Sequence, residues 1–157
     1  MTMQGESKMV EDVVILIADD DEGHLALIRK NLRRVGLRNT LLTFCNGQEV
    51  LDFLFMQGDG PHRDVGRAYL LLLDIRMPKV DGVEVLRQIK NDPELRKLPV
   101  TMLTTTDDPR EVERCHVLGC GNYVAKPVDY DKFIEAIRQL GLFFSVVQVP
   151  SINGPAK

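Results

Sequence analysis

Carboxylates, a hydroxyl and an ammonium group follow separate apolar runs in this 157-residue chain, each where its run ends. In chain order these residues are Asp19, Asp20, Asp21, Asp74, Thr104 and Lys126. Acidic groups crowded at the end of a hydrophobic strand are costly unless something neutralises them. A hard divalent cation such as Mg²⁺, which prefers oxygen ligands, would remove their repulsion. Metal, ammonium and hydroxyl together would make a cradle for a phosphoryl group, because phosphoryl transfer depends mainly on positioning and charge neutralisation.

Asp74 is the best candidate for a nucleophile in such a cradle. It stands alone at the end of the apolar run 69–73, and an aspartyl phosphate is a known covalent form of this chemistry. Lys126 would supply a compact positive charge, and Thr104 would supply a hydroxyl donor.

A plainer interpretation exists for each residue taken singly. An acidic residue at a strand end is usually a turn residue or a helix N-cap, and Asp21 in particular could simply cap a helix beginning near Glu22. Lysine is most often solvated. The joint pattern favours the functional interpretation, because four separate runs place the required residue type at the same end.

The elements that must position these residues follow from hydrophobic periodicity. Short apolar runs predict strands at 13–18, 40–45, 69–73, 99–103 and 122–125. Amphipathic stretches predict helices at 25–35, 47–56, 83–91, 109–118 and 130–142. This alternation predicts an α/β fold with a doubly wound, five-stranded parallel sheet in the order 2-1-3-4-5 and helices on both faces. The candidate residues would then converge at the carboxyl edge of the sheet.

Length and composition indicate one globular domain. Apolar residues make up 44% of the chain and charged residues 27%, with a formal net charge of −3 and no basic block that would favour nucleic-acid binding. No apolar run approaches the roughly 20 residues of a membrane helix, and the start lacks a signal-peptide pattern. The three cysteines lack paired spacing, so neither a disulfide framework nor a zinc site is predicted, and a reducing cytoplasm is the expected location. His24, His62 and His116 are expected to be surface or half-buried residues.

Three segments are expected along the chain: a flexible N-terminal segment at 1–12, the domain at 13–142 and a C-terminal extension at 143–157. From the end of the last predicted helix onward, the chain is rich in apolar side chains: Leu142, Phe143, Phe144, Val146, Val147 and Val149. Such a stretch predicts a dimer contact, since a complete core leaves little room for it. The alternative is that the extension folds back over its own sheet edge.

Together, the motifs at the strand ends resemble those of response-regulator receiver domains, over about 13–142. The matching segments are Ile15–Asp21 (ILIADDD), Leu71–Pro78 (LLLDIRMP) with Asp81-Gly82, Met102–Thr105 (MLTT) and Tyr123–Pro127 (YVAKP). Receivers have the flavodoxin-like strand order named above, so the resemblance and that topology are not independent indications.

The resemblance implies a role for each residue. Asp74 would be the phospho-acceptor, Lys126 would pair with the phosphate, and Thr104 and Tyr123 would form the switch. Mg²⁺ would be held by Asp19, Asp20, Asp74 and the backbone carbonyl of Arg76. The peptide bond between Lys126 and Pro127 would be cis.

A narrower resemblance concerns the small receivers that accompany cyanobacterial and bacterial phytochromes. The Gly/Pro-rich loop at 58–61 and the ending at 133–149 are similar to theirs. This narrower resemblance implies a sensor histidine kinase of the phytochrome type as phosphoryl donor, and a homodimer. Asp19 replaces the usual Glu of that subgroup, and Asp21 replaces a frequent Asn. Arg76 and Thr106 occupy positions that influence the lifetime of the phosphate in the family.

The resulting interpretation is a cytoplasmic two-component switch that signals by protein contact, since too few residues follow 142 for an output domain. It is not a turnover enzyme. One alternative is an aspartyl-nucleophile phosphatase of the haloacid dehalogenase type, although Arg76 stands where those enzymes carry a second Asp. Another is a receiver that takes no phosphate and acts only as an interaction module.

Overall fold

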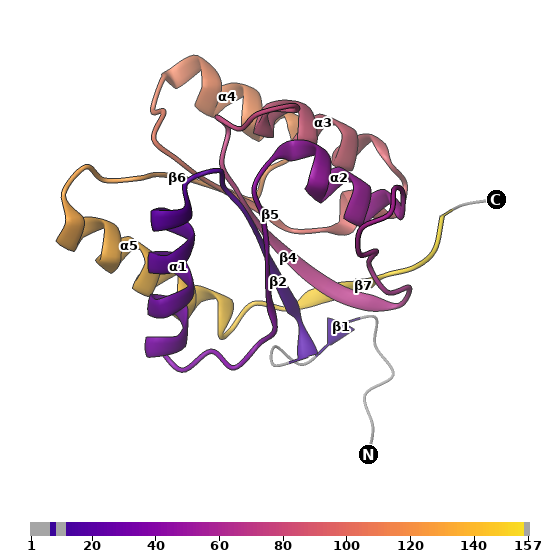
Figure 1. The fold of residues 1–157 in the computed structure, drawn as a ribbon, viewed down its shortest axis with the longest axis horizontal. Helices are drawn as coiled ribbons and strands as arrows, with labels where there is room; N and C mark the ends of the chain where they lie inside the picture. Colours follow the sequence, from indigo (N-terminus) through magenta and orange to yellow (C-terminus); the bar gives the residue numbers. More distant parts are fainter. Residues whose placement is uncertain (1–6, 9–11, 156–157) are drawn as a thin grey trace.

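The computed structural model describes residues 7–8 and 12–155. Its strands are β1 (Ser7–Lys8), β2 (Val14–Ala18), β3 (Leu41–Phe44), β4 (Arg67–Leu73), β5 (Val100–Thr104), β6 (Asn122–Ala125) and β7 (Val149–Ile152). Its helices are α1 (Glu22–Arg34), α2 (Gly47–Phe55), α3 (Gly82–Asn91), α4 (Pro109–Leu118) and α5 (Tyr130–Phe144), with a short 3₁₀ helix at Leu95–Lys97. Strands β3, β2, β4, β5 and β6 lie side by side in that order and run parallel (Figure 1). The predicted five-stranded parallel sheet in the order 2-1-3-4-5 is therefore confirmed.

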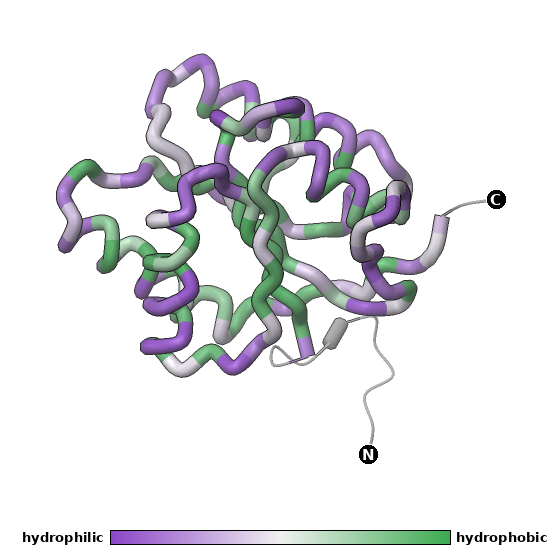
Figure 2. Tube along the Cα trace, in the orientation of Figure 1, coloured by the Kyte–Doolittle hydropathy of each residue, from purple (hydrophilic) through white to green (hydrophobic). Residues whose placement is uncertain are grey.

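Two layers of helices cover the sheet. Helices α1 and α5 lie on one face, and α2, α3 and α4 lie on the other (Figure 1). Successive side chains of β2 enter opposite cores: Leu16 packs with the α2–α4 layer, whereas Ile15 and Ile17 pack with the α1–α5 layer. Figure 2 shows hydrophobic residues along the strands and a mixture of both kinds along the helices. Because the central strands are buried on both faces, they read as continuous apolar runs in the sequence.

Side-chain caps fix where each helix begins. The N-cap side chains of Asp21, Asn46, Asp81, Asp108 and Asp129 each accept a hydrogen bond from a backbone N–H of the following helix. The plain interpretation of Asp21 as the cap of the first helix is thus confirmed. Among the described residues, no helix combines the length and the apolar character needed to cross a bilayer.

The C-terminal extension differs from the expected picture. Helix α5 continues to Phe144, and β7 pairs antiparallel with Arg67 and Ala68 at the start of β4. β7 can pair there because β4 begins at Arg67, whereas the pairing of β4 with β5 starts only at Leu71. Val149 and Phe144 are buried in the α1–α5 core, so the expectation that the core has no room for them is wrong. Residues 149–152 instead follow the alternative, in which the extension folds back onto its own sheet.

Not all of the apolar stretch that begins at Leu142 is covered. Leu142, Phe143 and Val146 remain exposed, at 58%, 43% and 75% of their surface. Most of the N-terminal segment predicted to be flexible lies outside the described residues, but Ser7 and Lys8 form β1 and pair antiparallel with β7.

Arg63 fastens β7 to the body of the domain. Its buried guanidinium donates to the carbonyls of Leu54 (2.8 Å), Ile152 (3.3 Å) and Asn153 (2.8 Å), joining the end of α2 to the extension. Burial lowers the pKa of Arg63, but a guanidinium keeps its proton in proteins. One side chain therefore satisfies three carbonyl groups that the fold brings together.

Substitution Arg63→Met should leave the carbonyls of Leu54 and Asn153 without this donor and loosen β7, although the Ile152 carbonyl keeps the Gly66 N–H. We expect a loss of about 2–4 kcal/mol in the free energy of unfolding, measured by urea denaturation. Hydrogen exchange of a peptide covering 149–152 should also accelerate. The control Arg67→Met removes an exposed arginine that pairs with Asp64 at 3.5 Å, and should cost about 0.5 kcal/mol or less. Equal losses for the two variants would show that Arg63 does not hold the strand.

Candidate functional site

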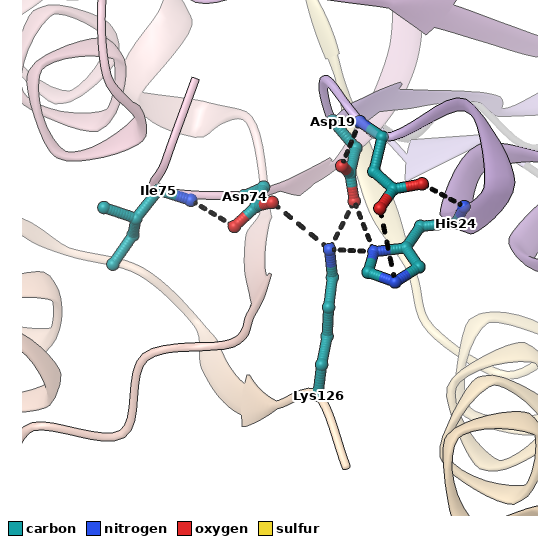
Figure 3. Close-up of polar contacts among 6 residues, drawn as sticks. Asp19, His24, Asp74, Ile75 and Lys126 are labelled. Carbon is teal, nitrogen blue, oxygen red and sulfur yellow. Dashed lines mark hydrogen bonds and ion pairs between the residues drawn. The ribbon is translucent and has the colours of Figure 1, made fainter. Parts of the chain in front are cut away.

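The predicted residues meet at the carboxyl edge of the sheet. Asp19 and Asp20 directly follow β2, Asp74 follows β4, and Lys126 follows β6, while Thr104 is the last residue of β5. Figure 3 shows the side chains of Asp19 and Asp74 on either side of the Lys126 ammonium group. The sheet order thus brings together groups that are up to 107 positions apart in the chain.

Lys126 is the hub of this pocket. Its Nζ donates to Asp19 Oδ2 at 2.5 Å and to Asp74 Oδ2 at 3.2 Å, and its side chain is only 2% exposed. Its backbone N–H donates to the carbonyl of Thr104 at 2.6 Å, which continues the β5–β6 pairing to the edge of the site. A buried ammonium group is tolerated here because two carboxylates compensate its charge.

The Asp74 carboxylate is held from both sides. Oδ1 accepts the backbone N–H of Ile75 at 2.7 Å, and Oδ2 accepts from Lys126. The backbone N–H of Asp74 donates to the carbonyl of Ala18 at 3.0 Å, so β2 and β4 stay in register up to the site. Gly82, the first residue of α3, packs directly against the backbone of Asp74, since a Cβ there would lie 2.0 Å from the Asp74 carbonyl oxygen.

Three carboxylates lie close together in this pocket. Oxygen atoms of Asp19, Asp20 and Asp74 all lie within 4.8 Å of one another, with Asp20 exposed and the other two buried. Burial raises the pKa of Asp19, although the hydrogen bonds from Lys126 and from the backbone N–H of Asp21 act in the opposite direction. This excess of negative charge, built from oxygen donors only, fits a hard divalent cation such as Mg²⁺.

The two switch candidates lie beside this pocket. The Thr104 side chain is fully buried, and its hydroxyl has no hydrogen-bond partner among the described residues. The Tyr123 hydroxyl donates to the carbonyl of Thr106 at 2.7 Å, in the loop that follows β5, and burial raises its pKa to about 12. Tyr123 therefore ties this loop to β6, and Thr104 has a free donor.

Two sequence expectations need correction or extension. No cis peptide bond occurs in the described residues, so the cis bond predicted between Lys126 and Pro127 is wrong. His24 is half-buried, as expected, but it lies inside the pocket, with Nδ1 2.9 Å from Lys126 Nζ. Its place in the first turn of α1 puts it near the acidic triplet, but the sequence pattern carries no signal for a contact with Lys126, 102 positions away. The role of the Arg76 carbonyl stays a prediction, and the Arg76 side chain is exposed.

Fold and pocket define an α/β domain with an acidic pocket at the carboxyl edge of its parallel sheet. Residues 15–138 match the response regulator receiver domain family, and the chain belongs to that family. It is 32% identical over 127 residues to the probable methanogenesis regulatory protein FilR2 of Methanothrix harundinacea, covering 81% of this chain and 80% of the relative. A solved response regulator receiver domain from Rhodospirillum rubrum is 47% identical, with a TM-score of 0.84, covering 90% of this chain and 99% of the other.

Structural neighbours also include phytochrome-associated regulators. The Mn²⁺-bound form of response regulator Rcp1, a protein of Synechocystis, has a TM-score of 0.79 at 27% identity and covers 88% of this chain and 99% of its own. The phosphorylated cyanobacterial phytochrome response regulator RcpA has a TM-score of 0.78 at 27% identity. The match covers 88% of this chain and 98% of the other.

Substitution Gly82→Ala should disturb the acceptor through its backbone. Alanine is normally better than glycine inside a helix, but here its Cβ would collide with the Asp74 carbonyl. We expect a loss of about 2 kcal/mol or more in the free energy of unfolding, measured by thermal and urea denaturation. Gly60→Ala is the matched control, because nothing lies within 4 Å of its added Cβ. If Gly82→Ala were as stable as that control, the close packing of α3 against Asp74 would be refuted.

Proposed function

We propose that this chain is a two-component switch in which Asp74 accepts a phosphoryl group from the phosphohistidine of a sensor histidine kinase. The observation that carries the proposal is the buried ammonium of Lys126, which contacts both Asp74 and the acidic pair member Asp19. Because this ammonium group already lies beside Asp74, it can pair with an oxygen of a phosphoryl group on that residue.

The chemistry is an in-line displacement at phosphorus. A carboxylate oxygen of Asp74 forms the new O–P bond while the donor's P–N bond breaks, and the departing imidazole keeps the electron pair and takes up a proton. Lys126 pairs with the negative charge of the transferred group. Mg²⁺, held by Asp19, Asp20, Asp74 and the Arg76 carbonyl, would neutralise further charge on that group.

Phosphorylation then changes the charge at one point of the fold. The acceptor gains strong hydrogen-bond acceptors and about one further negative charge. The unpartnered hydroxyl of Thr104 can donate to the phosphoryl group, and the loop held by Tyr123 can move with it. The switch is therefore a local electrostatic event that biases the arrangement of β5, β6 and α4.

The output is proposed to be a protein contact at the surface of α4, β6 and α5. Val117, Val128 and Tyr130 are exposed there, at 78%, 104% and 59% of their surface. We further propose a cytoplasmic location and a phytochrome as the sensor. The similarity to RcpA supports the phytochrome assignment.

The phosphatase alternative is less favoured. It needs a general acid two residues after the nucleophile, and Arg76 is always charged and cannot give up a proton there. An interaction module that takes no phosphate would not need a buried ammonium between two carboxylates, because such a group costs stability.

The central prediction is a base-labile phosphate on Asp74. With acetyl phosphate and Mg²⁺, intact mass spectrometry should show one adduct that alkali removes and that EDTA prevents. Asp74→Asn should form none, and Asp20→Asn should need more Mg²⁺ because it lacks one carboxylate ligand. An adduct that persists in Asp74→Asn would disprove the acceptor assignment. Continuous phosphate release at many turnovers per chain would instead favour the phosphatase.

We also propose that the chain forms a homodimer through the exposed part of its C-terminal region. Leu142, Phe143 and Val146 remain exposed at the end of α5 and just beyond it, and exposed apolar groups of this kind favour a partner. Deleting the extension would be a poor test, because Phe144, Val149 and Ile152 belong to the core of the same subunit.

Surface substitution tests the dimer without opening that core. The triple variant Leu142→Ser, Phe143→Ser, Val146→Ser should be a monomer in sedimentation equilibrium at micromolar concentration, where the wild type should be a dimer. Val65→Ser, an exposed apolar residue in another loop, serves as the control and should remain dimeric. Monomeric behaviour of the wild type, or a dimer that survives the triple substitution, would contradict the proposal.

A further inference from the structure

Within the part of the chain that the structure describes, His24 is hydrogen-bonded to Lys126, but the phosphoryl-transfer scheme above does not use it. It lies in the first turn of α1, and its Nδ1 atom is 2.9 Å from Lys126 Nζ (Figure 3). The same nitrogen is 3.9 Å from Asp19 Oδ2. The imidazole therefore lies beside the Lys126 ammonium group, on the side of the pocket formed by α1.

The orientation of this ring is fixed by its surroundings. The Phe133 ring packs against it with centroids 5.2 Å apart, and the backbone N–H of His24 donates to Asp21 Oδ1 at 3.0 Å. On the far side of the ring, Nε2 lies 3.6 Å from Asp21 Oδ2. An ammonium group only donates, so Nδ1 is the acceptor of the hydrogen bond between Lys126 Nζ and His24.

We propose that His24 is a positioning residue for phosphoryl transfer, holding the Lys126 ammonium in place for the phosphoryl group. This proposal rests on the function proposed above. The ammonium has three N–H donors and three acceptors here: Asp19 Oδ2, Asp74 Oδ2 and His24 Nδ1.

The three acceptors differ in what else they must do. Asp19 is a proposed metal ligand, and Asp74 is the proposed acceptor of the phosphoryl group, so both of their hydrogen bonds compete with the reaction. The His24 nitrogen has no such competing partner. It can therefore keep the ammonium anchored while the other two donors exchange carboxylate for phosphoryl oxygen.

Two substitutions separate this role from simple packing on Phe133. His24→Asn places an amide oxygen the same number of bonds from Cα as Nδ1, and so keeps an acceptor. His24→Leu fills similar space without one. His62→Leu, in an exposed loop outside the site, is the control.

The first measurement is the time course of phosphorylation by acetyl phosphate at saturating Mg²⁺, with intact mass as the readout. We expect His24→Leu to lower the maximal rate about tenfold, with a smaller change in half-saturation for acetyl phosphate. His24→Asn should recover most of that rate, and His62→Leu should match the wild type. A wild-type rate in His24→Leu, or equally slow Asn and Leu variants, would overturn the proposal.

The second measurement observes Lys126 directly and does not depend on phosphate uptake. In ¹⁵N-selective NMR of the full chain, a buried and hydrogen-bonded ammonium should give a slowly exchanging signal, assigned by its loss in Lys126→Arg. We expect that signal to survive in His24→Asn and to broaden or disappear in His24→Leu. An unchanged signal in His24→Leu would overturn the contact. If the NMR result holds but the wild type takes up no phosphate, the proposed function fails and the positioning contact stands.

Discussion

The carboxylates at the carboxyl edge of this sheet repel one another, and the rest of the site is arranged around that repulsion. Asp19 and Asp74 are almost fully buried, and they are held together by one ammonium group, that of Lys126. The arrangement leaves more negative than positive charge in the pocket. This excess of negative charge favours the binding of a cation in the pocket. It also favours a reaction that redistributes the charge.

The sheet is what makes this crowding possible. Parallel strands bring their carboxyl ends to one edge, so residues that follow β2, β4 and β6 meet although long helices separate them in the chain. Side-chain caps then fix where each helix begins. Gly82 allows α3 to begin against the backbone of Asp74, where any larger residue would collide with the carbonyl oxygen. The site is thus positioned by rigid elements rather than by long loops.

Most of this arrangement was predictable from the sequence, because strands buried on both faces appear as continuous apolar runs and because acidic and basic residues follow them directly. Three features were not predictable in the same way. The β7 pairing depends on where β4 and β5 begin to pair, a matter of register that the pattern of single segments does not contain. Arg63 lies in a polar loop, and only the folded chain shows that its guanidinium is buried against three carbonyls. His24 looked like an ordinary helix residue, because its contact with Lys126 spans 102 positions.

The start of strand β4 pairs with another strand, whereas its end leads directly into the acidic pocket. Its start pairs with β7, which in turn pairs with β1, while its end leads to Asp74. With about 3.3 Å per residue, the seven steps from Arg67 to Asp74 put the β7 pairing and the acceptor about 23 Å apart. The chain therefore enters and leaves the described fold on the side away from the acidic pocket (Figure 1). A tether attached at β7 would therefore leave the approach to Asp74 open.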